Sequence, residues 1–436
     1  MVLPTANKRK IAYLVSRFPK ISETFILYEI LALEQLGVEI ELFPLMRQRE
    51  TVQHLEAERW VEQAHYAHIL SPSVIASQIV WLVKAPRKYL GVWWKTLLAN
   101  RKSPKFLVRA IAAAWLGMHF ARQMQTLGVK HVHAHWATHP TVAAFVIGQM
   151  TGLPYSFTAH AHDIYVDRSM LAEKIDAARF VVTISNYNRR FLKNLYGEPA
   201  AEKTHVIHCG VDTQVFHPPE LPRRRHPFTM ITVASLEEKK GHTYLIEACA
   251  LLAKRGIDFR CLLVGEGDLR PALTQQIHSE GLSEQVVLLG YQPRARVNEL
   301  IAGADAMILP SVRLSSGKQE GIPVSLMEAL AVELPVIATD ISGVPELIED
   351  GVNGLLVPER NPQAIAAAVE RMVESPQFSQ QLGAAGRAKV LAEFDLHENA
   401  RALWDLINQA KEQQTDRQAD WLPEQKAELL SEGERS

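Results

Sequence analysis

Short apolar and β-branched runs alternate with longer segments of helical periodicity along most of the chain. Strands that are separated by helices form parallel sheets covered by helices on both faces. The pattern therefore predicts an α/β protein with two Rossmann-like domains, one after the other. The expected strands are Ile11–Ser16, Glu39–Leu45, His131–His135, Tyr155–Thr158, Phe180–Ser185 and Thr204–His208, then Thr229–Ala234, Phe259–Val264, Val286–Leu289, Ala306–Leu309, Val336–Thr339 and Leu355–Val357.

The length of 436 residues also favours two domains. We expect an N-terminal domain over residues 1–212, a C-terminal domain over 213–390, and a polar tail over 411–436 to which no chemistry is assigned. In open parallel sheets, ligands bind beyond the carboxyl ends of the strands. The cleft between the two domains is therefore the expected site.

Composition narrows the class of protein. Apolar residues make up 47% of the chain and charged residues 22%, as in soluble globular proteins. A net charge of −1 argues against a general nucleic-acid binder. Three cysteines without paired spacing fit the reducing cytoplasm and argue against a zinc cluster. No apolar run is long enough to predict a transmembrane helix.

The most informative motif runs from Glu320 to Glu328. Pro323 suits the first turn of a helix, so Glu320 is expected on the loop before the helix and Glu328 within it. A helix N-terminus attracts phosphate, and carboxylates accept hydrogen bonds from sugar hydroxyls. The pair therefore fits a nucleotide-sugar site. The alternative is an amphipathic surface helix with two solvated acids.

The flanking blocks resemble a known family. They are Ala306–Ser311, Pro335–Thr339, Ser342–Ile348 and Asp350–Val357. With the two glutamates separated by seven residues, their order is similar to the C-terminal half of retaining glycosyltransferases of family 4. The resemblance implies the GT-B fold, in which two Rossmann-like domains face a central cleft. It also implies that a helix over residues 391–410 returns to the N-terminal domain.

The loop after the first strand of the second half is the expected diphosphate site. The family pattern places an arginine and then a lysine here, and both contact the diphosphate of the donor. Lys240 matches the lysine, whereas Ser235 stands where the arginine is expected. The loss of one charge-assisted hydrogen bond costs about 1.5–3 kcal/mol. Arg313 and Lys318 are candidate substitutes because they precede Glu320 by a few positions.

The resemblance also implies the remaining donor contacts. Glu328 would bind the ribose hydroxyls, and Glu320 would face the donor sugar. Backbone contacts to the nucleotide or the sugar are expected at Gly265, Gly290, Tyr291, Gly321, Ile322 and Pro323.

Several histidines lie in the first half. On a strand, His131, His133 and His135 share one face. They permit a zinc site, but neighbouring acids and cysteines lack ligand spacing, so we expect buried histidines that satisfy backbone groups and no metal. By resemblance, His160 hydrogen-bonds the transferring sugar. Asp163 is expected to orient this loop rather than to act as a base.

Two further segments invite functional interpretations. The segment Ser16–Phe25 lacks the paired glycines of many family members and resembles a bacterial branch that builds colanic-acid-like exopolysaccharides. Within it, Glu23 either caps the next helix or contacts the acceptor, where it is the candidate general base. From Lys84 to Arg109 the chain carries eight basic residues, interleaved tryptophans and no acid. This stretch fits either a membrane interface or a solvated helical face with tryptophans in the core.

Together, the resemblance implies transfer of a hexosyl group, with retention, from a UDP- or GDP-type sugar to a saccharide or lipid-linked acceptor. It implies no cofactor and no catalytic metal. The expected setting is exopolysaccharide biosynthesis in the cytoplasm, with peripheral contact to the inner membrane. Two alternatives stay open at this point: another GT-B enzyme such as a nucleotide-sugar epimerase, or a non-catalytic nucleotide-sugar-binding protein.

Overall fold

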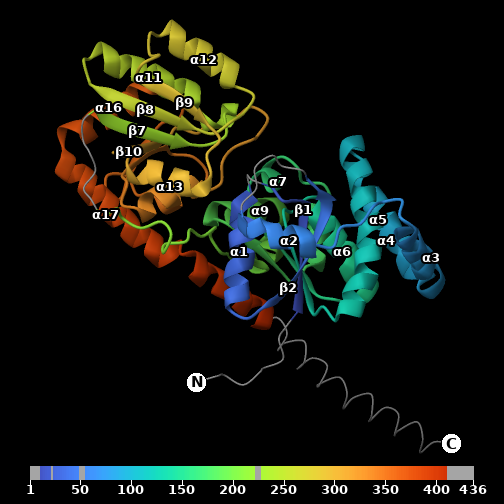
Figure 1. The fold of residues 1–436 in the computed structure, drawn as a ribbon. Coiled ribbons are helices and arrows are strands. Elements are labelled where there is room, and N and C mark those ends of the chain that lie inside the picture. The colour runs from blue at the N-terminus through green and yellow to red at the C-terminus, as the bar shows by residue number, and fades with distance from the viewer. Residues whose placement is uncertain (1–9, 21–22, 49–54, 221–226, 410–436) are drawn as a thin grey trace, which may run out of the picture.

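The computed structural model describes residues 10–20, 23–48, 55–220 and 227–409. The chain forms two halves, each built on a six-stranded sheet whose neighbouring strands pair in parallel (Figure 1). Apolar side chains fill the layers between each sheet and its helices. All twelve strands expected from the sequence are present, and the expectation of two Rossmann-like domains is confirmed.

The first sheet has the strand order β2-β1-β3-β4-β5-β6. Its strands are β1 (Lys10–Phe18), β2 (Glu39–Arg47), β3 (His131–His135), β4 (Tyr155–Ala159), β5 (Phe180–Thr183) and β6 (Thr204–Val206). The helices of this half are α1 (Thr24–Gln35), α2 (Glu58–Gln63), α3 (Pro72–Lys84), α4 (Pro86–Asn100), α5 (Pro104–Leu127), α6 (His139–Thr151), α7 (His162–Tyr165), α8 (Leu171–Ala177), α9 (Asn186–Tyr196) and α10 (Glu198–Glu202).

The second sheet has the order β12-β11-β10-β7-β8-β9. Its strands are β7 (Phe228–Val233), β8 (Phe259–Val264), β9 (Val286–Gly290), β10 (Ala306–Leu309), β11 (Val336–Thr339) and β12 (Leu355–Val357). Its helices are α11 (His242–Lys254), α12 (Arg270–Ser279), α13 (Arg294–Ala302), α14 (Val324–Ala331), α15 (Val344–Leu347), α16 (Pro362–Glu374) and α17 (Pro376–Glu393).

The end of the described chain ties the halves together. After α17, a helix over residues 396–409 packs into the apolar core of the first sheet through Leu396, Ala400, Leu403 and Ile407 (Figure 1). Elsewhere, the Glu346 carboxylate of the second half accepts hydrogen bonds from the backbone N–H groups at the start of α9. The exact domain limits stay predictions, and the tail over 411–436 lies outside the described residues.

Each sheet reverses its strand order at one point. The reversal lies between β1 and β3 in the first sheet and between β7 and β10 in the second. Loops that leave neighbouring strands in opposite directions open a crevice there, which is where ligands bind in open α/β sheets. The loops after β7 and β10 carry Lys240 and Glu320 respectively. The topology therefore brings the two most informative sequence motifs together.

Candidate active site between the two halves

Three charged side chains form an ion cluster where the β7 and β10 loops meet. Lys240 Nζ lies 2.9 Å from one carboxylate oxygen of Glu320, and Lys239 Nζ lies 2.9 Å from the other. The backbone joins the same loops, because Val312 N–H donates to the Lys239 carbonyl oxygen. The lysine expected from the sequence is therefore in contact with the expected glutamate, and a second lysine lies beside it.

The cluster has a definite ionisation state. Burial alone would raise the pKa of Glu320, but Lys240 and Lys239 outweigh burial and lower it to about 2. Burial opposes the charge on Lys239, yet the Glu320 carboxylate raises the pKa of Lys239 above its usual value. Two lysines against one carboxylate give the cluster an excess of one formal positive charge, which suits an anionic ligand.

The Glu320 loop lies against the loop that follows β4 in the other half. A Cβ atom added at Gly321 would lie 2.7 Å from the Ile184 side chain and 3.7 Å from the His160 carbonyl oxygen. A larger residue at this position would have to displace the end of the flexible Ile184 side chain. The structure therefore places the His160 loop next to Glu320, although the two residues are far apart in sequence.

Asp163 shapes the His160 loop. Its carboxylate accepts hydrogen bonds from the backbone N–H groups of Ala137, His160 and Ala161, at 2.7 to 3.1 Å. Burial raises the pKa of this carboxyl, and the backbone donors oppose the rise. These bonds occupy the carboxylate within the loop, so the prediction that Asp163 orients the loop is confirmed.

The second glutamate of the motif has different surroundings. Glu328 lies in α14 and is half-buried, and burial raises its pKa to about 7 against the opposing charge of Arg294. The Arg294 guanidinium lies 3.8 Å from the centre of the Tyr28 ring, which belongs to the other half. Glu328 is therefore poised between its neutral and ionised forms near physiological pH.

The residues expected to make backbone contacts fall into two groups, one between Glu320 and α14 and the other at the ends of β8 and β9. Pro323 directly precedes α14, which begins at Val324 rather than at the proline itself, and Ile322 is buried. Gly265 adopts a positive φ of 141°, and an added Cβ would lie 2.0 Å from the Ala234 carbonyl oxygen. Its N–H donates to Gly290 at the end of β9, and Tyr291 follows.

A cavity of about 620 Å³ lies between the halves. Lys20, Glu23 and Trp136 line it from the loops after β1 and β3, and Lys239 and Lys318 line it from the other half. Glu23 is buried and pairs with Lys20. Two of the sequence candidates, Glu23 and Lys318, therefore share one cavity with Lys239 of the ion cluster.

The third candidate lies elsewhere. Arg313 is exposed, its Nε lies 3.4 Å from a carboxylate oxygen of Glu359, and its backbone N–H donates to the same side chain. Ser235 uses its carbonyl oxygen to bind the His242 ring. Among the described residues it is Lys239, not Arg313, that supplies a second positive charge beside Lys240.

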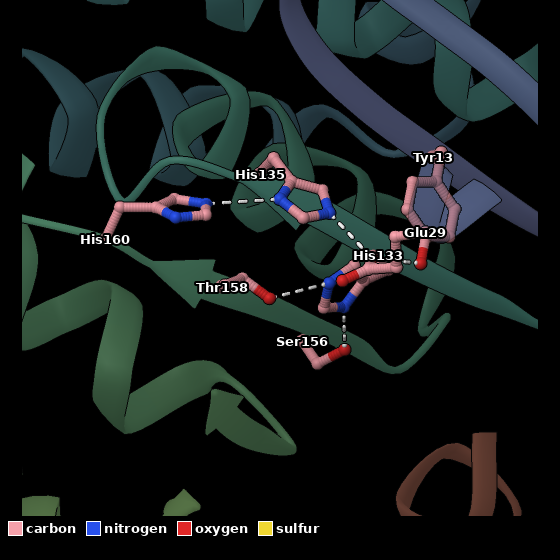
Figure 2. Close-up of polar contacts among 7 residues, drawn as sticks. All are labelled: Tyr13, Glu29, His133, His135, Ser156, Thr158 and His160. Carbon is pink, nitrogen blue, oxygen red and sulfur yellow. Dashed lines mark hydrogen bonds and ion pairs between the residues drawn. The ribbon is translucent and has the colours of Figure 1, made fainter. Parts of the chain in front are cut away.

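Behind His160 lies a series of hydrogen-bonded polar side chains, of which Tyr13, His135 and His160 are buried and Glu29 is half-buried (Figure 2). His160 Nε2 lies 3.2 Å from His135 Nδ1, and His135 Nε2 lies 2.9 Å from Glu29 Oε1. Tyr13 donates to the same carboxylate oxygen at 2.7 Å. His133 is bound separately, by the hydroxyl groups of Ser156 and Thr158.

Part of this chain has the ligand types of a metal site. Ligand atoms of Glu29, His133 and His135 lie within 4.8 Å of one another. Each ring nitrogen of the two histidines, however, already contacts a protein partner. A metal ion would have to displace several of these hydrogen bonds. The strand-face arrangement of the histidines is as expected. The expectation that they satisfy backbone groups is wrong for these three, because the rings of His131, His133 and His135 bind side chains on α1, β4 and the loop after β4.

Sequence reasoning missed Lys239, Arg294 and Glu29. Adjacent lysines gave a signal for the first, but a pattern does not reveal which of two neighbours faces a ligand. Arg294 and Glu29 are brought to the site by contacts between distant elements. For these two residues the sequence carried no local signal.

Two known protein families match this chain, one in each half. Residues 22–215 match the family described as Glycosyltransferase Family 4, and residues 215–389 match the family described as Glycosyl transferases group 1. Together the two matches span most of the chain.

Two individual relatives are also glycosyltransferases. The chain is 38% identical over 207 residues to the amylovoran biosynthesis glycosyltransferase AmsK of Erwinia amylovora, covering 48% of this chain and 51% of that protein. It is 32% identical over 384 residues to the putative colanic acid biosynthesis glycosyltransferase WcaL of Salmonella typhimurium, covering 82% of this chain and 89% of that protein.

Solved structures share the fold at low identity. HepE of Anabaena, crystallised with UDP-glucose, aligns with a TM-score of 0.68 at 18% identity, over 92% of this chain and 99% of that one. A glycosyltransferase from Rickettsia africae aligns with a TM-score of 0.67 at 18% identity, over 93% and 99%. The expected GT-B architecture is confirmed, and the chain belongs to the glycosyltransferases of family 4.

Proposed function

We propose that this glycosyltransferase moves a hexosyl group from a nucleotide diphosphate sugar, of UDP or GDP type, to a saccharide or lipid-linked acceptor in exopolysaccharide biosynthesis. The observation that carries this proposal is the cluster of Lys239, Lys240 and Glu320 beside the His160 loop. Two of the relatives are named for exopolysaccharides, amylovoran and colanic acid.

Each group of the cluster has a chemical role in the proposal. Negative charge develops on the diphosphate as the bond to the sugar breaks, and Lys240 and Lys239 stabilise that charge. In this proposal the lysines take the role that a metal ion has in other transferases of phosphate-linked groups. Glu320 accepts hydrogen bonds from the donor sugar, and the ionised form of Glu328 accepts them from the two ribose hydroxyls.

Retention requires the acceptor to attack from the side that the diphosphate leaves. His160 and Glu320 would hold the sugar between the halves, while the acceptor approaches from the cavity that contains Glu23. The lining of this cavity carries basic side chains such as Arg109 and Lys318, acidic side chains such as Asp167 and Glu237, and apolar residues such as Leu45 and Leu116. This mixture suits an acceptor with polar hydroxyl groups and an apolar portion.

Incubation with donor alone tests the proposal. UDP-glucose, UDP-galactose and GDP-mannose are supplied separately, and products are separated by chromatography. The proposal predicts slow release of nucleoside diphosphate and free sugar from one of them. An altered sugar nucleotide without release would indicate an epimerase, and failure of all three to bind or react would contradict the choice of donor class.

Donor binding should depend on pH through Glu328. Its pKa is about 7 in the protein, and only the ionised form accepts both ribose hydroxyls. As pH falls through 7 the carboxylate takes up a proton that donor binding must remove, so affinity falls; above 7 affinity is level. Between pH 8 and pH 6 the Kd for donor should rise about tenfold, measured by calorimetry.

The control for this prediction is Glu328→Gln, whose side chain does not titrate. The variant should bind donor more weakly than the native protein at pH 8 and with the same Kd at both pH values. A tenfold pH dependence that persists in Glu328→Gln would assign the titration to another group.

The N-terminal half also carries a surface that suits peripheral membrane contact. Among the described residues, eleven of the sixteen exposed large apolar side chains lie between Ile69 and Val108. On each of α3 and α4 they form a stripe along one face, and the spacing along the sequence is the same in both helices. The stripes comprise Ile75, Ile79, Leu82 and Val83 on α3 and Leu90, Trp94, Leu97 and Leu98 on α4. Figure 1 shows this pair at the edge of the molecule, away from the second half.

The inward faces of these helices are unusually polar, since Ser77, Gln78, Thr96 and Asn100 are buried. The eight basic residues from Lys84 to Arg109 are all exposed. Trp81 is buried and Trp94 is exposed, so the tryptophans divide between the core and the surface. Outward apolar stripes beside basic residues fit the interface of an anionic bilayer. No helix in the described ranges has the length and hydropathy needed to span a membrane.

Vesicle sedimentation tests this part of the proposal. The protein should bind vesicles containing phosphatidylglycerol and bind neutral phosphatidylcholine vesicles weakly. The double variant Leu90→Ser with Trp94→Ser should lose at least about tenfold in affinity, because each large apolar side chain contributes roughly 1.5–3 kcal/mol when buried. Leu195→Ser, which removes an exposed leucine outside the stripes, should bind like the native protein. If the double variant and Leu195→Ser bound the phosphatidylglycerol vesicles with equal affinity, the stripes on α3 and α4 would not be the membrane-contact surface.

A further inference from the structure

The buried chain behind His160 connects a carboxylate to the proposed sugar-binding ring. Its members come from four elements: Tyr13 from β1, Glu29 from α1, His135 from β3, and His160 from the loop after β4 (Figure 2). His135 and His160 are almost fully buried. The order of the strands β1, β3 and β4 in the sheet makes this alignment possible.

The direction of the hydrogen bonds follows from the carboxylate. An ionised carboxylate only accepts hydrogen bonds. Glu29 Oε1 accepts from Tyr13, and burial raises the pKa of this tyrosine well above its usual value, so the hydroxyl keeps its proton. The same oxygen accepts from His135, whose Nε2 must then carry hydrogen.

The position of hydrogen on His135 then determines the position of hydrogen on His160. An imidazole with hydrogen on Nε2 alone offers its Nδ1 as a lone pair, and His135 Nδ1 lies 3.2 Å from His160 Nε2, which then donates to it. Burial holds the pKa of His160 well below its usual value, so this ring is neutral and carries one proton. The remaining nitrogen, Nδ1, is an acceptor, and it has no protein partner among the described residues.

We propose that Glu29, acting through His135, holds His160 in the tautomer with hydrogen on Nε2, so that Nδ1 accepts a hydrogen bond from a hydroxyl of the transferring sugar. Glu29 and His135 are then positioning residues for the reaction. The ring of His160 is also confined by Phe25 and Trp136, with centroids 4.8 and 4.5 Å away. Packing therefore fixes the orientation of the His160 ring, and Glu29 determines which of its two nitrogens carries hydrogen. The inference rests on the proposed contact between His160 and the donor sugar.

The tautomer is measured directly by 15N magnetic resonance on full-length protein labelled at histidine. The His160 signals are those that disappear in His160→Gln. The native protein should show hydrogen on Nε2 of His160, and Glu29→Met, which removes the acceptor, should populate the other tautomer. An unchanged tautomer in Glu29→Met, or hydrogen on Nδ1 in the native protein, would overturn the inference. This readout needs neither donor nor activity.

Turnover gives a second readout. Glu29→Met should lower kcat for donor consumption about 10- to 100-fold with little change in KM, as removal of an orienting partner does elsewhere. Glu29→Gln keeps an accepting oxygen and should lose less. In a His160→Ala background Glu29→Met should cost nothing further, because both act through one ring. If the losses in kcat from Glu29→Met and His160→Ala multiplied in the double variant, Glu29 would not act through His160.

The matched control is Glu41→Met. Glu41 accepts from His65 Nε2 at 2.7 Å, so it forms the same kind of pair in the same half but is not part of the chain to His160. It should leave the His160 tautomer and kcat unchanged. If His160→Ala itself leaves turnover unchanged, the proposed role of His160 fails, whereas the tautomer spectra still decide whether Glu29 controls the ring.

Discussion

Replacement of Lys240 by alanine should lower kcat for donor consumption by about 10²- to 10³-fold, the usual cost of removing one group that stabilises developing negative charge. Lys240 is the more buried of the two lysines, with 13% of its side chain exposed against 27% for Lys239. Its charge is therefore less screened by water. The fold should survive, because Lys239 remains as a partner for the Glu320 carboxylate.

Two comparison variants make the Lys240→Ala result specific. Lys239→Ala should cost less than Lys240→Ala but clearly more than Lys254→Ala, which removes an exposed lysine at the end of α11. Release of nucleoside diphosphate over a range of donor concentrations gives kcat and KM for each. Equal activity in Lys240→Ala and Lys254→Ala would contradict the diphosphate site, whatever the behaviour of Lys239→Ala.

Replacement of Glu320 by glutamine should separate catalysis from nucleotide binding. The carboxylate has two functions in this account: it accepts hydrogen bonds from the sugar, and it neutralises both lysines. Glutamine keeps the shape but removes the charge. We expect kcat to fall by about 10²- to 10³-fold, as for loss of a transition-state contact. UDP or GDP should bind at least as tightly as before, because both lysines lose their competing anion.

Calorimetry with UDP and GDP, together with turnover, checks this separation. A thermal melt of Glu320→Gln confirms that the variant is folded at the assay temperature. If nucleotide affinity fell in parallel with kcat, the carboxylate would be holding the site together rather than facing the sugar. Glu346→Gln serves as a control, since that carboxylate also bridges the halves but binds backbone N–H groups at α9.

Hydrophobic periodicity was enough to locate the strands, because buried parallel strands are short apolar runs between polar loops. The meeting of Lys240 and Glu320 was also predictable once the family resemblance supplied the strand order. The sequence alone does not give this order, since β7 pairs with β10 across more than seventy residues. The pairing of Glu29 with His135 depends on the same kind of long-range neighbour and left no local pattern.

The surface of α3 and α4 illustrates a different limit. An apolar stripe with helical spacing looks the same in sequence whether it faces the core or the solvent. Leu90 and Trp94 are exposed, whereas Thr96 and Asn100 on the same helix are buried. Only the packing of the helix against α5 and α6 decides which face turns outward. For this reason the sequence left membrane contact and core packing as equal alternatives.

The missing family arginine shows how a departure from a pattern can be offset nearby. Ser235 removes one cation from the β7 loop, and Lys239 supplies another four residues later in direct contact with Glu320. The sequence pointed instead to Arg313 and Lys318, because distance along the chain was the only guide. Arg313 pairs with Glu359, and Lys318 lines the cavity between the halves together with Lys239.

The most direct test of the central claim is a calorimetric titration of UDP-glucose, UDP-galactose and GDP-mannose into the native protein and into the double variant Lys240→Ala with Glu328→Ala. The account predicts saturable binding of at least one sugar nucleotide at pH 8, with affinity lost by 100-fold or more in the double variant. Binding of equal strength to both proteins would mean that the donor binds elsewhere and would contradict a donor site at Lys240 and Glu328.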